Sequence, residues 1–202
     1  MFFIYQVLLS LIILISPLVI IFRILKGKED IIRFKEKFCS FSKKRNSGKL
    51  LWFHGSSVGE IMSVLPIISK YDKDNSIDQI LITSSTLSSS KILEKYKFKK
   101  VDHQFFPIDH FIFSRIFLNY WKPHLVIFLE SEIWPSMYRE IMFKKIPLIL
   151  LNARITKKTF KRWNKFKKYS SEIFNLIDYA YPQNNETKNY LRNLGVKKIN
   201  LI

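Results

Sequence analysis

The chain has 202 residues, of which 48% are hydrophobic and 15% aromatic, with only 5 Gly, 7 Pro and 1 Cys. This composition excludes a disordered protein, because so much apolar content can bury a core that offsets the entropy lost on folding. The single cysteine excludes a disulfide framework, and no Cys and His residues stand at zinc-binding spacing. The 34 Lys and Arg against 16 Asp and Glu give a net charge of +18, which favours an anionic partner such as a nucleic acid, a membrane surface or a phosphorylated substrate.

The N-terminus begins with an apolar run. Phe2 to Phe22 carries no charge, and a helix of about 20 such residues crosses the roughly 30 Å hydrocarbon core of a bilayer. Positive charges follow this run, at Arg23, Lys26 and Lys28, whereas a secretory signal peptide carries them in front. We therefore expect residues 1–25 to form an uncleaved single-pass anchor in the inner membrane, with a cytoplasmic remainder and the N-terminus on the far side. A buried core helix is the alternative.

Residues 26–48 connect the apolar run to the rest of the chain. Gly27 to Phe41 mixes apolar and charged side chains, which predicts a short amphipathic helix along the membrane or the domain surface. Ser42 to Lys49 is polar and rich in helix breakers, so we interpret it as a linker. A folded domain is then expected over residues 49–202.

From residue 49 onward, short apolar runs alternate with longer segments of helical periodicity. The runs that we predict to be strands are Leu51 to His54, Gln79 to Thr83, the segment around Phe105 and Phe106, His124 to Glu130, Pro147 to Asn152, and Asp178 to Tyr181. The segments that we predict to be helices are Val58 to Tyr71, Lys91 to Phe98, Phe111 to Trp121, Pro135 to Lys145, and Phe160 to Leu176. This alternation indicates an α/β fold, a doubly wound Rossmann-like parallel sheet covered on both faces.

In such a sheet, ligands bind beyond the carboxyl ends of the strands, so the residues directly after each strand are the candidate site. The first candidate segment is His54-Gly55-Ser56-Ser57-Val58-Gly59-Glu60. Its two glycines permit a tight turn and close backbone approach, and a carboxylate at Glu60 is favoured in the first turn of a helix. Glu60 could instead only complete a capping box with Ser57. The segment lacks the glycine pattern and the Gly-Lys-Ser/Thr ending of nucleotide phosphate loops.

Two further candidate segments follow later strands. Glu130-Ser131-Glu132-Ile133-Trp134-Pro135 puts two acids and a tryptophan directly after the most hydrophobic run, with the proline beginning the next helix. One of the acids could merely cap that helix. Asn152-Ala153-Arg154 follows the next strand, and its guanidinium could pair with a phosphate or with one of those carboxylates. A structural ion pair accounts for Arg154 equally well.

Taken together and in this order, the motifs resemble a known family. They are H-G-S-S-V-G-E, the loop Thr83 to Thr86, F-P-I-D at Phe106 to Asp109, E-S-E-I-W-P, and L-N-A-R-I-T at Leu151 to Thr156. This series behind one apolar helix is similar to the N-terminal half of the bacterial 3-deoxy-D-manno-octulosonic acid (Kdo) transferases, over roughly Gly27 to the end of the chain. The resemblance implies a GT-B architecture of two Rossmann-like domains. This chain would hold the acceptor-binding domain and lack the C-terminal donor domain.

The resemblance also implies an activity and a set of site residues. Those enzymes transfer Kdo from CMP-Kdo to a lipid A precursor in lipopolysaccharide biosynthesis, by an inverting reaction without a metal or other cofactor. Glu60 corresponds to the general base, and Glu130 or Glu132 to a second important glutamate. Without a donor domain, the chain is expected to bind the acceptor but not to turn over alone. The residues implied to bind the acceptor or support the site are His54, Gly55, Ser56, Ser57, Gly59, Thr83, Ser84, Glu130, Glu132, Trp134, Asn152 and Arg154.

The basic excess has several interpretations. Thr156 to Tyr169 sets four aromatic residues among seven Lys and Arg, which suits a helix on anionic head groups or a solvated helix whose aromatics face the core. A membrane-tethered nucleic-acid-binding module is a second possible function, but no recognition motif supports it and we expect no nucleic acid partner. A GT-B transferase with another donor, such as a UDP-sugar, is a third, because fold alone does not fix the donor.

Overall fold

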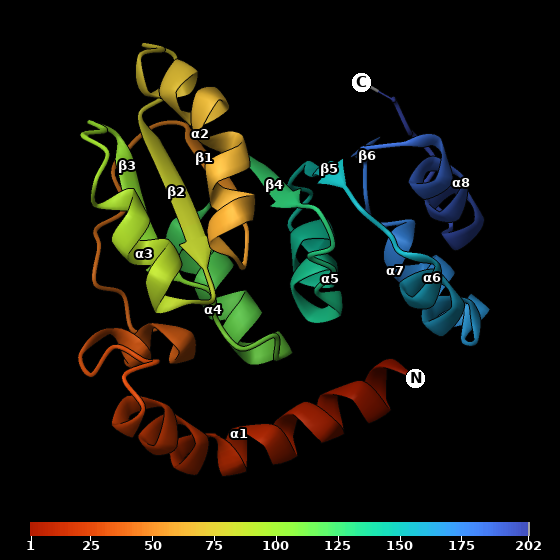
Figure 1. The fold of residues 1–202 in the computed structure, drawn as a ribbon, viewed down its shortest axis with the longest axis horizontal. Helices are drawn as coiled ribbons and strands as arrows, with labels where there is room; N and C mark the ends of the chain where they lie inside the picture. Colours follow the sequence, from red (N-terminus) through yellow and green to blue (C-terminus); the bar gives the residue numbers. More distant parts are fainter. Residues whose placement is uncertain (202) are drawn as a thin grey trace.

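The computed structural model describes residues 1–201, which form one six-stranded sheet with helices on both faces (Figure 1). The strands are β1 (Leu50–His54), β2 (Gln79–Ser84), β3 (Val101–Phe105), β4 (Leu125–Leu129), β5 (Leu148–Ala153) and β6 (Tyr179–Pro182). They are ordered β3-β2-β1-β4-β5-β6, and every neighbouring pair is parallel. This is the order of a doubly wound Rossmann fold, so the predicted fold class and all six predicted strands are confirmed.

The helices of the domain follow the strands in alternation. They are α2 (Val58–Asp72), α3 (Leu87–Leu93), α4 (Phe111–Trp121), α5 (Pro135–Phe143), α6 (Lys157–Asn164), α7 (Lys167–Phe174) and α8 (Asn185–Leu194). Helix α4 has the predicted bounds, and α2 and α5 differ from prediction only at their ends. Helix α8 was not predicted; it begins at the N-cap Asn184 and ends at Gly195, which has a left-handed backbone.

Two other predictions of helices were wrong in extent. Gly27 to Phe41 forms only a short 3₁₀-helix, η1 (Arg33–Phe38), and ends in a left-handed residue, Cys39 (φ 63°). Helix α3 begins at Leu87 rather than Lys91, because the Thr86 side chain caps its first turn. Helix propensity alone does not reveal such a cap, because the cap depends on how the backbone leaves the preceding strand.

The predicted helix from Phe160 to Leu176 is divided into α6 and α7 at Phe166, whose backbone is not helical (φ −117°, ψ 54°). The break brings the Trp163 ring centroid to 5.2 Å from Phe174 and 6.4 Å from Tyr169. The lysines of this basic segment are mostly exposed, and only Phe166 among its aromatic residues is also exposed. The segment is therefore a solvated basic surface whose remaining aromatic side chains pack on the core.

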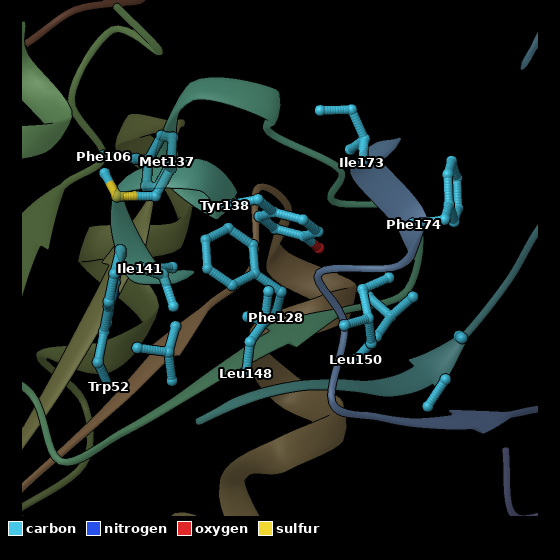
Figure 2. Packing of buried hydrophobic residues seen from close by; sticks show 14 of the residues in the cluster. Trp52, Phe106, Phe128, Met137, Tyr138, Ile141, Leu148, Leu150, Ile173 and Phe174 are labelled. Atoms are coloured by element: carbon cyan, nitrogen blue, oxygen red, sulfur yellow. The ribbon is translucent and has the colours of Figure 1, made fainter. Parts of the chain in front are cut away.

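Successive strand residues point to opposite faces of the sheet and form two buried layers. One layer packs under α2 and α3, and its strand residues are Leu51, Phe53, Ile80, Ile82, Ile127 and Leu129. The other packs under α4, α5, α7 and α8, and its strand residues include Trp52, Leu81, Val126, Phe128, Leu148 and Leu150 (Figure 2). Because both faces are covered, the strands read as continuous apolar runs in the sequence.

Helix α1 (Phe2–Leu25) precedes the domain, and it is the one helix among residues 1–201 that is long and apolar enough to cross a membrane. Figure 1 shows it beneath the domain, on the side toward which the β2 arrow points, and it contacts Asp109 after β3 and Ser136 after β4. Only 11% of its most apolar window is buried. Helix α1 therefore adjoins the carboxyl edge of the sheet and leaves most of its own surface uncovered.

Phe128 tests the larger core layer, since its side chain is fully buried between Trp52 and Tyr138. We expect Phe128→Ala to lower the free energy of unfolding by about 3–5 kcal/mol, because the change leaves a cavity in a close-packed layer. The matched control is Phe143→Ala on α5, where the ring is 59% exposed and the expected loss is below about 1 kcal/mol. Chemical unfolding in detergent solution measures both; equal losses would contradict this description of the core.

Candidate functional site

The candidate site lies at the carboxyl ends of β1 and β4. These strands are neighbours, with His54 opposite Phe128, and the strand order reverses between them. Crevices at such a switch point are where ligands bind in doubly wound sheets. Glu60 lies in the segment after β1 and Glu132 in the segment after β4, so the structure brings two of the predicted segments together.

One carboxylate oxygen of Glu132 receives three hydrogen-bond donors. Its Oε2 lies 3.1 Å from Nε2 of His54, 2.6 Å from Oγ of Ser56 and 2.8 Å from Nε1 of Trp134. Its Oε1 has no hydrogen-bond partner within residues 1–201. Burial alone would raise the pKa of Glu132, but the hydrogen bond and charge of His54, with the bonds from Ser56 and Trp134, hold that pKa below its usual value. Glu132 is therefore an ionised group with one oxygen left for a ligand.

His54 is fully buried and held from both sides of its ring. Its Nδ1 lies 2.9 Å from Oγ1 of Thr83, and that hydroxyl accepts a hydrogen bond of 2.8 Å from Nε1 of Trp52. Because the carboxylate of Glu132 can only accept, Nε2 of His54 donates to it, and Nδ1 also lies 3.2 Å from the backbone carbonyl oxygen of Thr83. Phe106 stacks on the imidazole with ring centroids 3.9 Å apart. These contacts fix the orientation of the imidazole toward Glu132.

Glu60 lies in the first turn of helix α2, and its carboxylate is hydrogen-bonded to the segment before the helix. Its Oε1 accepts from Oγ of Ser57 at 2.8 Å, and its Oε2 accepts from the backbone N–H of Ser56 at 2.8 Å. Ser57 in turn accepts from the Glu60 N–H and so caps α2, whereas Glu60 accepts from the N–H of Ser56 rather than of Ser57, so only half of the predicted capping box is formed. Burial raises the pKa of Glu60, against the hydrogen bond from Ser57 and with help from the charge of Glu132. The Glu60 carboxylate is thus a stronger base than an ordinary glutamate.

Ser56 joins the two glutamates. Its backbone N–H donates to Glu60, and its hydroxyl donates to Glu132. The hydroxyl also lies 3.2 Å from Oγ of Ser85, in the loop after β2. The two carboxylates therefore share one residue but have pKa values shifted in opposite directions, the pattern expected where two acids are assigned different tasks.

Other predicted site residues lie apart from this cluster. The Oγ of buried Ser84 contacts Nε2 of His103 on β3 at 2.9 Å. Glu130 and Asn152 both have left-handed backbones (φ 51° and 54°) at the ends of β4 and β5. Arg154 is exposed, and within residues 1–201 its guanidinium forms no ion pair; its backbone N–H instead donates to the Glu130 carbonyl at 3.2 Å. The ion pair that the sequence allowed for Arg154 is not observed.

Three residues at the cluster were not among the predicted site residues. The hydroxyl of Tyr138 donates to the backbone carbonyl of Glu132 at 2.8 Å, Phe106 covers the imidazole, and Ser85 contacts Ser56. Tyr138 stands one helical turn after Trp134, so the spacing on α5 was an available signal. The motifs F-P-I-D and T-S-S-T contain the other two, but no pattern showed which of their side chains turn toward the site.

No metal centre accompanies the two glutamates. The part of the chain that the structure describes, residues 1–201, contains no group of three or more His, Cys, Asp or Glu side chains placed to hold a metal ion. The described cluster consists of two carboxylates that accept hydrogen bonds from His54, Ser56, Ser57 and Trp134.

Gly55 offers a test of the close packing under the cluster. A Cβ at this position would lie 2.9 Å from Cδ1 of Leu129 and 3.0 Å from Cβ of Glu60. We expect Gly55→Ala to displace Glu60 and to lower both the unfolding temperature and any activity that depends on this carboxylate. Gly59→Ala is the matched control, because its nearest neighbour would be Oγ of Ser57 at 4.0 Å and alanine favours the helix. Thermal unfolding of both variants checks this; an unchanged Gly55→Ala protein would contradict it.

The strand order and the position of the site define the class: a Rossmann-like α/β domain with a switch-point site. Solved structures of the same class include the UDP-GlcNAc 2-epimerase of Neisseria meningitidis bound to UDP-GlcNAc, with a TM-score of 0.55 and 15% identity over 76% of this chain and 46% of that chain. A second is the UDP-N-acetylglucosamine 2-epimerase of Rickettsia bellii, with a TM-score of 0.51 and 15% identity over 76% and 44% of the two chains. At this identity the likeness shows the fold alone.

The chain belongs to the 3-deoxy-D-manno-octulosonic acid transferase (Kdo transferase) family, whose sequence profile matches residues 32–202. The Kdo transferase of Rickettsia bellii is 40% identical over 93% of this chain and 45% of that protein. The probable mitochondrial Kdo transferase of Arabidopsis thaliana is 38% identical over 80% of this chain and 37% of that protein. The resemblance inferred from the five motifs is thus confirmed. The chain spans less than half the length of these two relatives.

Proposed function

We propose that this protein transfers Kdo from CMP-Kdo to a lipid A precursor in lipopolysaccharide biosynthesis, with inversion at the anomeric carbon. Family membership supports Kdo transfer in general. One observation supports the proposed mechanism. The carboxylates of Glu60 and Glu132 both accept hydrogen bonds from Ser56, at the switch point of the sheet. One is suited to take a proton and the other to stay ionised.

In the proposed reaction, a hydroxyl oxygen of the acceptor forms a bond to the anomeric carbon of Kdo. The carbon–oxygen bond to the phosphate of CMP breaks, and CMP leaves with that electron pair. Glu60 takes the proton of the attacking hydroxyl, because its raised pKa brings it closer to the operating pH than an ordinary glutamate. Glu60 lies on an open turn, where Gly59 has free space around it for the acceptor.

Glu132 has a different proposed role. With its Oε2 engaged by His54, Ser56 and Trp134, its Oε1 can accept a hydrogen bond from a second hydroxyl of the acceptor. Such a bond orients the acceptor beside Glu60, and positioning of this kind lowers the entropic part of the barrier. The indole of Trp134 is half-buried, and its Nε1–H donates to Oε2 of the same carboxylate.

The proposal assigns the partners to different parts of the protein. Residues 49–202 form the acceptor-binding domain, and CMP-Kdo binds mainly to a second Rossmann-like domain of a GT-B architecture. Helix α1 and the segment 26–48 hold the domain at the cytoplasmic face of the inner membrane, where the positive charge of the chain attracts anionic lipid. No metal or other cofactor and no nucleic acid enters this proposal.

Glu60→Gln in the full-length protein tests the proposed base. We expect kcat for Kdo transfer to fall by about 10²- to 10⁴-fold, because an amide cannot take the proton. Binding of the lipid A precursor should persist, since glutamine can keep the hydrogen bond from Ser57. In the unchanged protein, kcat/KM should fall as the pH falls through a pKa above the usual 4.5 of glutamate, where Glu60 becomes protonated. Turnover at the unchanged rate in Glu60→Gln would remove Glu60 from this role.

The two glutamates after β4 provide a matched pair. We expect Glu132→Gln to lower kcat/KM by about 10- to 100-fold, the range for losing a hydrogen bond to a charged group. Glu130→Gln should lower it less, because the Glu130 side chain has no hydrogen-bond partner within residues 1–201 and acts on Glu60 only through its charge, the last of the causes that raise the pKa of Glu60. Steady-state kinetics with CMP-Kdo and the lipid A precursor measure both, and the reverse order of effects would contradict the assignment.

A further inference from the structure

The N-terminal half of helix α1 is hydrogen-bonded to the domain. The hydroxyl of Tyr5 donates to Oδ2 of Asp109 at 2.7 Å, and the side-chain amide of Gln6 donates to Oγ of Ser136 at 2.7 Å. The carbonyl oxygen of the same Gln6 side chain accepts from the backbone N–H of Phe111 at 3.2 Å. We call Tyr5, Gln6, Asp109 and Ser136 the latch.

Asp109 connects the latch to the candidate site. Its carboxylate is 2% exposed and also accepts from the backbone N–H groups of Ser136, at 3.1 Å, and Met137, at 2.8 Å. These groups belong to the first turn of α5, which receives no cap from its own N-cap residue Trp134. One buried carboxylate therefore holds both α1 and the helix that carries Trp134 and Tyr138.

The contact continues along the whole of α1. The buried or half-buried positions recur at every third or fourth residue, which is one face of a helix: Phe2, Tyr5, Gln6, Leu9, Ile13, Ser16, Ile20, Arg23 and Ile24. At the far end, Arg23 pairs with Glu29 at 3.0 Å. Gln6, Ser16 and Arg23, which are poor residues for contact with lipid, all lie on this covered face.

The opposite face of α1 is apolar and exposed. Its large side chains are 43–80% exposed and include Phe3, Val7, Leu11, Leu14, Leu18 and Leu25. Ile112 and Ile116 of α4, which are 48% and 41% exposed, extend this surface beside the latch. An apolar surface of this length is larger than soluble monomers normally leave exposed. Lys26 and Lys28 follow it directly, which suits anionic head groups rather than a protein partner.

We propose that α1 is an in-plane membrane helix, which the latch holds flat along the domain while its apolar face enters an anionic bilayer surface. An orientation across the bilayer, with Met1 on the far side, would require all three latch hydrogen bonds to Tyr5 and Gln6 to break. In the flat orientation, the carboxyl edge of the sheet faces the bilayer (Figure 1). If the proposed function holds, on which this step rests, the flat orientation lets a lipid-borne acceptor reach Glu60 and Glu132 without leaving the membrane.

Cysteine labelling of the full-length protein in phosphatidylethanolamine and phosphatidylglycerol vesicles tests the orientation. In a Cys39→Ser background, one variant carries a cysteine in a short extension before Met1, and the other carries Ser88→Cys on the exposed part of α3. A membrane-impermeant maleimide is added without detergent. If α1 lies flat, the two cysteines are labelled to the same fraction in each preparation. If α1 crosses the bilayer, the two cysteines lie on opposite sides of the membrane, so the two labelled fractions add up to one. That result overturns the proposal.

The latch itself is tested in the same assay with Tyr5→Phe and Gln6→Leu combined. These changes remove the three latch hydrogen bonds of Tyr5 and Gln6 but leave the contact of Ser10 with His110 and the bonds that Asp109 accepts from α5. We expect the labelled fractions of the two cysteines to diverge in this variant, whereas equal fractions would show that the latch does not hold α1. The readout does not use transferase activity. An inactive protein with flat α1 would contradict the proposed function alone, and an active protein with crossing α1 would contradict only this inference.

Discussion

The negative charge of Glu132, held at the point where the strand order reverses, is the constraint on which the site depends. A carboxylate this far buried needs donors to replace water, and it receives them from His54, Ser56 and Trp134 on one oxygen. Each donor comes from a different direction: the end of β1, the turn before α2, and the start of α5. The hydrogen bonds to this one charge therefore connect segments that follow β1 and β4, the two strands that pair at the centre of the sheet.

The second carboxylate acquires its properties from the first. Glu60 accepts only from neutral groups of Ser56 and Ser57, and it feels the charge of Glu132, so both burial and repulsion raise its pKa. Glu132 has the imidazole of His54 and keeps a low pKa under greater burial. Two chemically identical side chains thus differ in basicity because one contacts an imidazole and the other does not. Gly55 makes the arrangement possible, since a side chain there would push Glu60 and Leu129 apart.

The sequence was sufficient to predict the sheet and the segments that form the site. Strands buried on both faces read as apolar runs without alternation, and residues at the carboxyl end of a parallel strand converge whatever the loops do. Which of Glu130 and Glu132 contacts His54 was not predictable from the sequence. Glu130 takes a left-handed backbone, which is unusual for a residue other than glycine, and this turn directs the side chain of Glu132 rather than its own toward His54.

The orientation of α1 was beyond sequence reasoning for a related reason. Its hydropathy predicts contact with a membrane, and this is equally compatible with a helix that crosses the bilayer and one that lies along it. The few polar residues of α1 recur on one face, but their meaning depends on whether the domain offers partners, and those partners come from residues more than 100 positions away. Only the fold reveals that Asp109 and Ser136 stand where Tyr5 and Gln6 need them.

Asp109 belongs to one of the five family motifs, but it supports the fold beside the candidate site. Burial raises its pKa to about 6, against the opposing hydrogen bonds from Tyr5, Met137 and Ser136. A buried acid with a raised pKa is normally a candidate for catalysis. Here both oxygens are already engaged by the protein, so the carboxylate has no means to meet a ligand. Instead, the Asp109 carboxylate accepts hydrogen bonds from the first turn of α5. It thereby positions the start of that helix and the adjacent Trp134, whose indole donates to the charged carboxylate of Glu132.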